Sequence, residues 1–131
     1  RIDMFMEDAA TIRKAMANIQ KLGSEAQPDF NQIVRWTMAK DTHAGQIQER
    51  VASYWLAQRI KAPVDAGAKA RPKYLTQLEL MHGITVAAMK CKQGTDAKWV
   101  EKLESLVMAF SATYFSPEDL QHIRDHHDHD H

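Results

Sequence analysis

The sequence contains only one cysteine, Cys91, among its 131 residues. A disulfide within the chain is therefore impossible, and a cysteine-rich zinc site is excluded because it needs several thiolates. So few cysteines fit a reducing compartment, where thiols remain free. We accordingly expect a cytoplasmic protein in which Cys91 is a small, partly buried and inert side chain.

The chain also lacks an excess of either charge and lacks long apolar runs. Lys plus Arg and Asp plus Glu each number 17, so the formal net charge is zero. Without a basic excess, we expect no direct nucleic-acid contact by this chain. No apolar run reaches the roughly 18 residues of a membrane span, so we expect no membrane partner. The start, RIDMFMEDAA, is acidic and does not resemble a signal peptide. Because it begins at Arg1, we expect a piece of a longer protein.

Recognisable catalytic motifs are missing as well. There is no glycine-rich phosphate loop, no nucleophile elbow and no HExxH zinc motif. No histidine and acid can be assigned to Cys91 as catalytic partners. We therefore predict no catalytic residues and no cofactor, and a binding or regulatory module in preference to an enzyme.

Helical periodicity is what the sequence does contain. Apolar residues make up 44% of the chain and charged residues 26%, as in an ordinary globular domain. Nothing in the sequence has the pattern of a strand. We predict an all-α fold, a bundle of about five to six helices in a single domain over residues 1–124, followed by a disordered His/Asp-rich tail at 125–131.

The first predicted helix, residues 2–22, carries a heptad pattern. Its apolar residues are three and four positions apart, the spacing of a coiled coil: Ile2, Phe5, Ala9, Ile12, Met16 and Ile19. Gly23 then stops the helix. The stripe suits either packing within its own domain or pairing with a second copy, and we predict a homodimer through residues 2–22.

Further helices are predicted from start signals and apolar spacing. Pro28 and Asp29 begin a second helix, whose pattern is interrupted by polar residues at 41–43 and then continues to about Ile60. A long loop follows at 61–73. Later helices are predicted at 73–93, after a cap at Thr95 or Asp96, and from Ser116, where the sequence Ser-Pro-Glu-Asp favours a helix start.

Aromatic and methionine side chains cluster on these helices. Such residues line apolar pockets that accept bulky ligands, although they also fill any helical core. The candidate ligand-binding residues are Trp36, Met38, Tyr54, Trp55 and Trp99.

The last seven residues, DHHDHDH, offer imidazoles and carboxylates that bind divalent transition metals. Such tracts bind metals loosely, without a fixed geometry. The candidate metal ligands are His126, His127, His129 and His131. A second motif, Glu79 with His82, has the spacing used in di-iron bundles, but its second copy is missing.

Several segments together resemble a known family. They are the heptad helix IRKAMANIQKLG, the Pro-Asp-Phe helix start, the segment AKWVEKL and the segment YFSPEDLQHIRDH. This set is similar to the effector-binding region of MerR-type transcriptional regulators, nearest to the TipA-like group with all-helical drug-binding domains. The resemblance implies a ligand crevice between helices and dimerisation through the long helix.

We therefore expect a domain that binds a hydrophobic or aromatic drug-like molecule, either in a transcriptional regulator or as a stand-alone antibiotic-sequestering protein. Two alternatives remain open at this point. The first is a helical interaction module without a small-molecule ligand, and the second is a metal-responsive protein that uses the tail.

Overall fold

The computed structural model describes residues 1–64 and 69–114. In these residues the chain forms α1 (Ile2–Gly23), α2 (Phe30–Arg50), η1 (Val51–Arg59), α3 (Arg71–Gln93) and α4 (Ala97–Tyr114). None of the described residues lies in a strand, so the all-α prediction is confirmed. The expected count of five to six helices was slightly high, because η1 continues α2 directly and the helix predicted from Ser116 lies outside the described residues.

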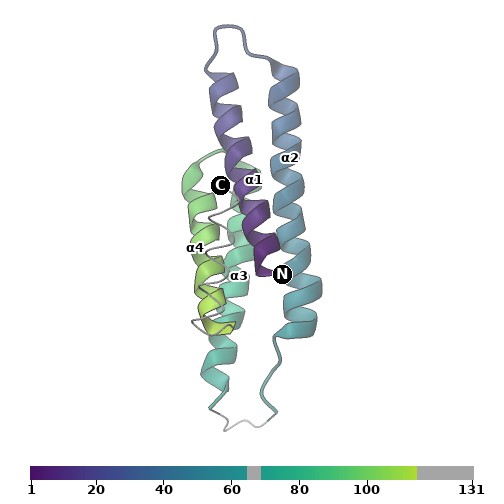
Figure 1. Ribbon diagram of the computed structural model, residues 1–131, viewed down its shortest axis with the longest axis vertical. Coiled ribbons are helices and arrows are strands. Elements are labelled where there is room, and N and C mark those ends of the chain that lie inside the picture. The colour runs from purple at the N-terminus through teal and green to yellow at the C-terminus, as the bar shows by residue number, and fades with distance from the viewer. Residues whose placement is uncertain (65–68, 115–131) are drawn as a thin grey trace.

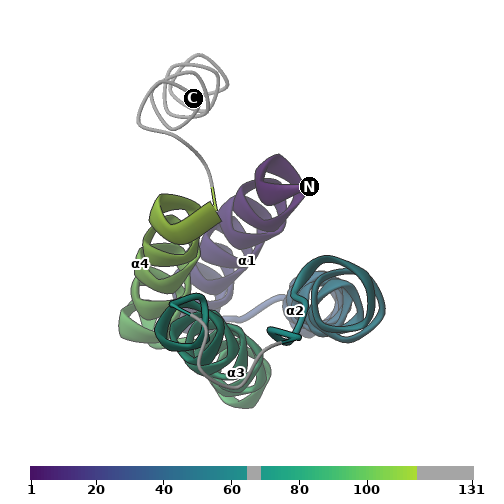
Figure 2. The same ribbon diagram turned by 90° about the horizontal axis from the view of Figure 1, so that it is seen from below.

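The four α-helices run alternately up and down and form a bundle (Figure 1). Viewed from below, they lie in the order α1, α2, α3 and α4 around the bundle, with α1 packed against both α2 and α4 (Figure 2). The turn between α1 and α2 extends beyond the upper ends of α3 and α4. This projection leaves apolar side chains of the first half of α2 uncovered, namely Phe30, Val34 and Met38.

Helix ends follow local chemistry for three of the four α-helices. Asp3 lies in the first turn of α1, where a negative charge is favourable. Asp29 caps α2 by accepting a hydrogen bond from the Gln32 amide at 3.1 Å. Asp96 accepts from the Lys98 amide at the start of α4 at 3.0 Å, which confirms the predicted cap.

The heptad stripe of α1 is buried within its own bundle. Ile2, Phe5, Ala9, Ile12 and Met16 are each at most 2% exposed. A dimer seam made from this stripe is therefore wrong, since helices of the same chain, chiefly α2 and α4, already cover these side chains.

The second helix runs on through the polar residues at 41–43 without a break, and α2 ends at Arg50. One of these polar residues, His43, has its partner on a neighbouring helix. His43 Nδ1 lies 2.7 Å from Asp8 Oδ1 on α1, and Arg50 pairs with the other oxygen of the same buried carboxylate. Asp8 is only 4% exposed, so these two partners compensate for a charge that is removed from water.

The last nine residues of the long second helix, η1, are wound as a π-helix. The Ile60 amide donates to the Trp55 carbonyl five residues earlier, at 2.8 Å. Such segments are uncommon and often occur at functional sites. The turn geometry places Trp55 in the core, with 1% of its surface exposed.

Among residues 1–64 and 69–114, no helix is both long and apolar enough to cross a lipid bilayer.

Candidate functional site

An aromatic cluster surrounds Trp55 in the lower part of the bundle. Its ring contacts four other rings at centroid distances of 4.9–6.1 Å. The members of this Trp55 cluster are Phe5, Tyr54, Trp55, Phe110 and Tyr114. They come from α1, η1 and α4, so the cluster joins the elements that meet at this level. Trp55 Nε1 is buried and has no hydrogen-bond partner among the described residues.

The edge of the Trp55 cluster is polar. Arg59 donates from Nε and Nη2 to the Tyr114 hydroxyl, and its guanidinium also lies 5.5 Å from the centre of that ring. The hydrogen bond to Tyr114 raises the pKa of Arg59, so the side chain stays cationic. The cluster thus changes from a buried apolar centre to a charged, exposed rim.

The five aromatic and methionine candidates from the sequence do not share a pocket. Tyr54 and Trp55 contact each other in the Trp55 cluster. Trp36 lies on α2 in a shallow hollow beneath Lys14, and Met38 is 64% exposed. Trp99 lines a separate groove between α3 and α4. No single crevice between helices collects all five residues.

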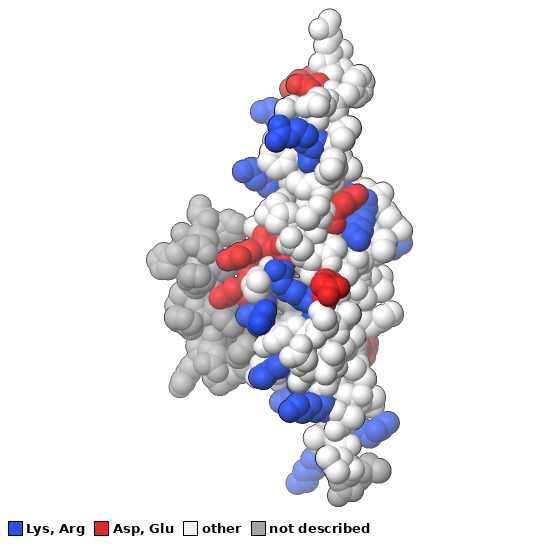
Figure 3. Space-filling view, turned by 90° about the vertical axis from the view of Figure 1, so that its right-hand side faces the viewer, with Lys and Arg blue, Asp and Glu red and all other residues white. Residues whose placement is uncertain are grey.

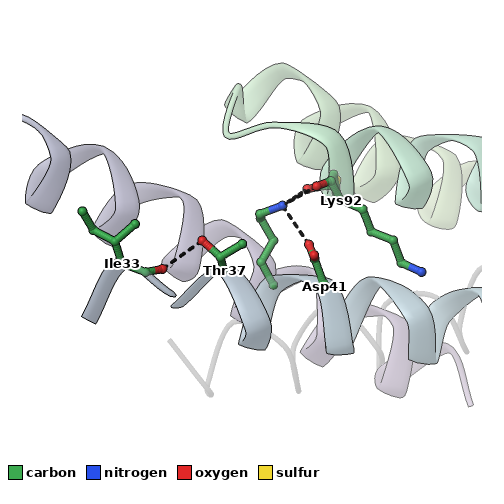
Figure 4. Close-up of polar contacts among 6 residues, drawn as sticks. Ile33, Thr37, Asp41 and Lys92 are labelled. Carbon is green, nitrogen blue, oxygen red and sulfur yellow. Dashed lines mark hydrogen bonds and ion pairs between the residues drawn. The ribbon is translucent and has the colours of Figure 1, made fainter. Parts of the chain in front are cut away.

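A buried lysine connects α2 with the end of α3. Lys40 is 2% exposed, and its Nζ donates to the carbonyls of Cys91 at 2.6 Å and Lys92 at 2.9 Å. The Asp41 carboxylate lies 3.0 Å from the same nitrogen. Figure 4 shows Asp41 on one helix facing Lys92 on the other across this contact. A positive charge is favourable here, because the last carbonyls of a helix have no partner within the helix.

Cys91 is fully buried beside this contact. Burial raises the pKa of its thiol to about 11, which the nearby Glu104 supports and Lys40 opposes. Thiolate is the reactive and metal-binding form of cysteine, so the expected inert role is consistent with this environment.

The raised pKa makes a testable contribution to stability. Above about pH 9 the unfolded thiol ionises while the folded thiol keeps its proton until about pH 11. The folded state then binds more protons, so stability falls as pH rises through this window and is fully retained below it. We expect this residue to contribute a loss of about 1 kcal/mol between about pH 8 and about pH 10.

Urea unfolding of the parent chain and of Cys91→Ala at both pH values isolates this contribution, because lysine and tyrosine titration is common to both proteins. The alanine variant is expected to lose less stability over the window. Equal pH slopes for the two proteins would show that burial of the thiol has no such effect.

Metal donors are sparse in the described part of the chain. Its only histidines are His43, which is bound to Asp8, and His82, which lies exposed on α3. No three His, Cys, Asp or Glu side chains among the described residues are grouped so that they could hold a metal ion. The candidate ligands His126, His127, His129 and His131 lie outside the described residues.

Comparison with protein families gives a match to the family model described as nickel-containing superoxide dismutase, over residues 2–118. No curated protein and no solved structure matches the chain.

This match overturns the expected function. The chain is not the effector-binding region of a MerR-type regulator, and a hydrophobic drug-like partner is not supported. The capping and heptad patterns that suggested that family are shared by many helical proteins, because they report helix ends and packing rather than chemistry. The prediction of a non-enzyme was wrong for a related reason, since the absence of catalytic motifs was its only basis.

The described residues do not fit a nickel centre, although nickel is the metal that the family name implies. Imidazole, carboxylate and thiolate are the available donor types. Here the Cys91 thiol is buried in its protonated form, and the His43 imidazole is bound to Asp8. The His82 imidazole has no further donors grouped with it among the described residues. These helices therefore form a framework without a described metal centre.

The matched segment begins at the first residue of α1 and extends beyond the last residue of α4, so it includes every described helix. The match is thus to the whole bundle and not to a short motif within it. The chain belongs to the nickel-containing superoxide dismutase family.

Proposed function

We propose that this chain forms the helical framework of an enzyme that converts superoxide to dioxygen and hydrogen peroxide with a bound nickel ion. The observation that carries the proposal is the family match over residues 2–118. The bundle supports it through the rigid contacts that join its helices. These are the Trp55 cluster, the Asp8 ion pairs and the Lys40 link to α3.

The nickel donors in this proposal lie outside the described residues. Within the printed sequence, the imidazoles left are that of His122 and those of the tail, which the sequence analysis singled out together with its carboxylates. Nitrogen and oxygen donors suit divalent nickel, so His126, His127, His129 and His131 remain candidate ligands. A cytoplasmic location and a single domain ending near residue 124 also remain predictions.

The test uses the complete gene product, purified after growth with nickel. We expect bound nickel by plasma mass spectrometry, and superoxide removal in a stopped-flow assay that disappears when the metal is removed and returns with nickel. Zinc reconstitution is the control, because zinc has no redox chemistry at the metal. The absence of nickel-dependent superoxide removal at full nickel loading would contradict the proposal.

Two variants locate the donors. Truncation after residue 124 removes four tail histidines, and His82→Gln removes an exposed imidazole of the bundle as a matched control. We expect His82→Gln to keep both nickel and activity. Loss of both on truncation would assign the metal to the tail, whereas retention of both would place the donors elsewhere outside the described helices and make tail binding adventitious. Loss of nickel in His82→Gln would contradict a framework without its own metal centre.

A further inference from the structure

A pocket lies at the lower end of the bundle, between the end of η1 and the start of α3. Its volume is about 270 Å³. The residues that line it are Arg59, Lys61, Ala70, Lys73, Tyr74, Gln77 and Tyr114. It adjoins the polar rim of the Trp55 cluster, because Tyr114 belongs to both.

The lining is positively charged. Three of the seven lining residues are cations, and none is an acid. Lys61 and Lys73 form no ion pair within residues 1–64 and 69–114. Arg59 donates to the Tyr114 hydroxyl, and a guanidinium has five N–H donors, so it keeps donors for a further acceptor. In Figure 3 the residues coloured by charge at the lower end of the visible face are Lys and Arg.

The start of α3 adds to this positive field. The first-turn amides of a helix have no acceptor within the helix and carry the positive end of its dipole. α3 has no acidic residue in its first turn and no side-chain cap from Ala70. Instead, Arg71 and Lys73 place two cations at this end. Cations at the positive end of the α3 dipole are electrostatically unfavourable. A bound anion would instead be stabilised by both the cations and the dipole.

We propose that this pocket binds a small oxyanion of the phosphate class. The ammonium groups of Lys61 and Lys73 and the remaining N–H groups of Arg59 surround the bound oxygens, and the α3 dipole favours their negative charge. The pocket is large enough to admit an inorganic ion. The site involves neither nickel nor its donors, so it is independent of the dismutase proposal.

The test is a calorimetric titration of the chain with inorganic phosphate at low ionic strength, with chloride at matched ionic strength as the reference. We expect one phosphate per chain and a Tm that rises with phosphate concentration, because binding only to the folded state stabilises it. Lys61→Gln and Lys73→Gln are each expected to weaken binding about three- to tenfold, and the double variant to abolish it. The matched control is Lys21→Gln, which removes the same charge from an exposed site on α1.

Lys73→Gln has a second expected signature. Without phosphate its Tm should equal or slightly exceed that of the parent chain, because the substitution removes a cation from the positive end of α3. If Lys73→Gln binds phosphate more weakly but is as stable as the parent chain, the weaker binding comes from loss of the site and not from loss of the fold. The expected binding behaviour also requires no metal, so it can be measured whatever the nickel content.

Three outcomes would overturn the proposal. Equal weakening by Lys21→Gln would show that phosphate responds only to total charge. Absence of saturable binding would show that the pocket is not a phosphate site. Asp65, the single acid between residues 59 and 73, lies outside the described residues. The same phosphate titration is therefore made with Asp65→Asn. Phosphate binding that appears only in this variant would also overturn the proposal for the native chain.

Discussion

Replacing Trp55 with alanine is expected to lower the free energy of unfolding by about 4 kcal/mol, the typical cost of removing a large aromatic side chain from a core. The indole is 1% exposed and contacts rings on α1, η1 and α4. Its loss leaves a cavity where these elements meet. Urea unfolding followed by circular dichroism measures the change.

Two other substitutions serve as controls for this effect. Trp36→Ala removes the same side chain from the half-buried outer face of α2, and we expect a loss below about 1 kcal/mol. Trp55→Phe keeps an aromatic ring and removes Nε1, which has no partner, so its cost should be clearly below that of alanine. A Trp55→Ala variant as stable as Trp36→Ala would contradict a central role for the Trp55 cluster.

Replacing Lys40 with methionine is expected to cost about 3 kcal/mol of stability. Methionine fills a similar volume but cannot donate to the carbonyls of Cys91 and Lys92. Replacing a buried ion pair as a whole with apolar residues is often harmless, but here the acceptors belong to the backbone and no substitution can remove them. The buried carbonyl of Cys91 and the partly buried carbonyl of Lys92 would then both lack this donor.

Equilibrium unfolding in urea gives the stability, and hydrogen exchange shows whether the last turn of α3 opens first. The matched control is Lys21→Met, an exposed lysine on α1, with an expected change within about 0.5 kcal/mol. If Lys40→Met were as stable as this control, the buried lysine would have no structural role at the end of α3.

Much of the helical structure was predictable from local signals. Apolar spacing and Gly23 gave the first helix nearly to the residue, and Asp29 and Asp96 marked real caps. These signals act within one or two turns, so they do not depend on the rest of the fold. The polar residues at 41–43 left the course of the helix open for the opposite reason, because the partner of His43 is Asp8 on α1, far away in the sequence.

The functional prediction was overturned by the family match, and the aromatic residues that it treated as one ligand set do not share a pocket. Trp55 is core, Met38 is exposed, and Trp36 and Trp99 lie in separate hollows. No helical pattern distinguishes a packed indole from one that lines a crevice, because both need the same residue type at the same spacing. The basic bias of the loop at 61–73 was a usable signal for the cationic pocket, but only the fold brings Arg59 and Tyr114 to it.

The sequence alone determined that the chain is all-α, where most helices begin and end, and that one cysteine cannot form a disulfide within the chain. Tertiary structure decided which faces meet: the α1 stripe packs inside its own chain, and Lys40 reaches across to α3. It also determined which charges gather at the start of α3. The physical reason is range, because capping and periodicity act over a few residues, whereas burial and charge compensation depend on partners that only the folded bundle brings together.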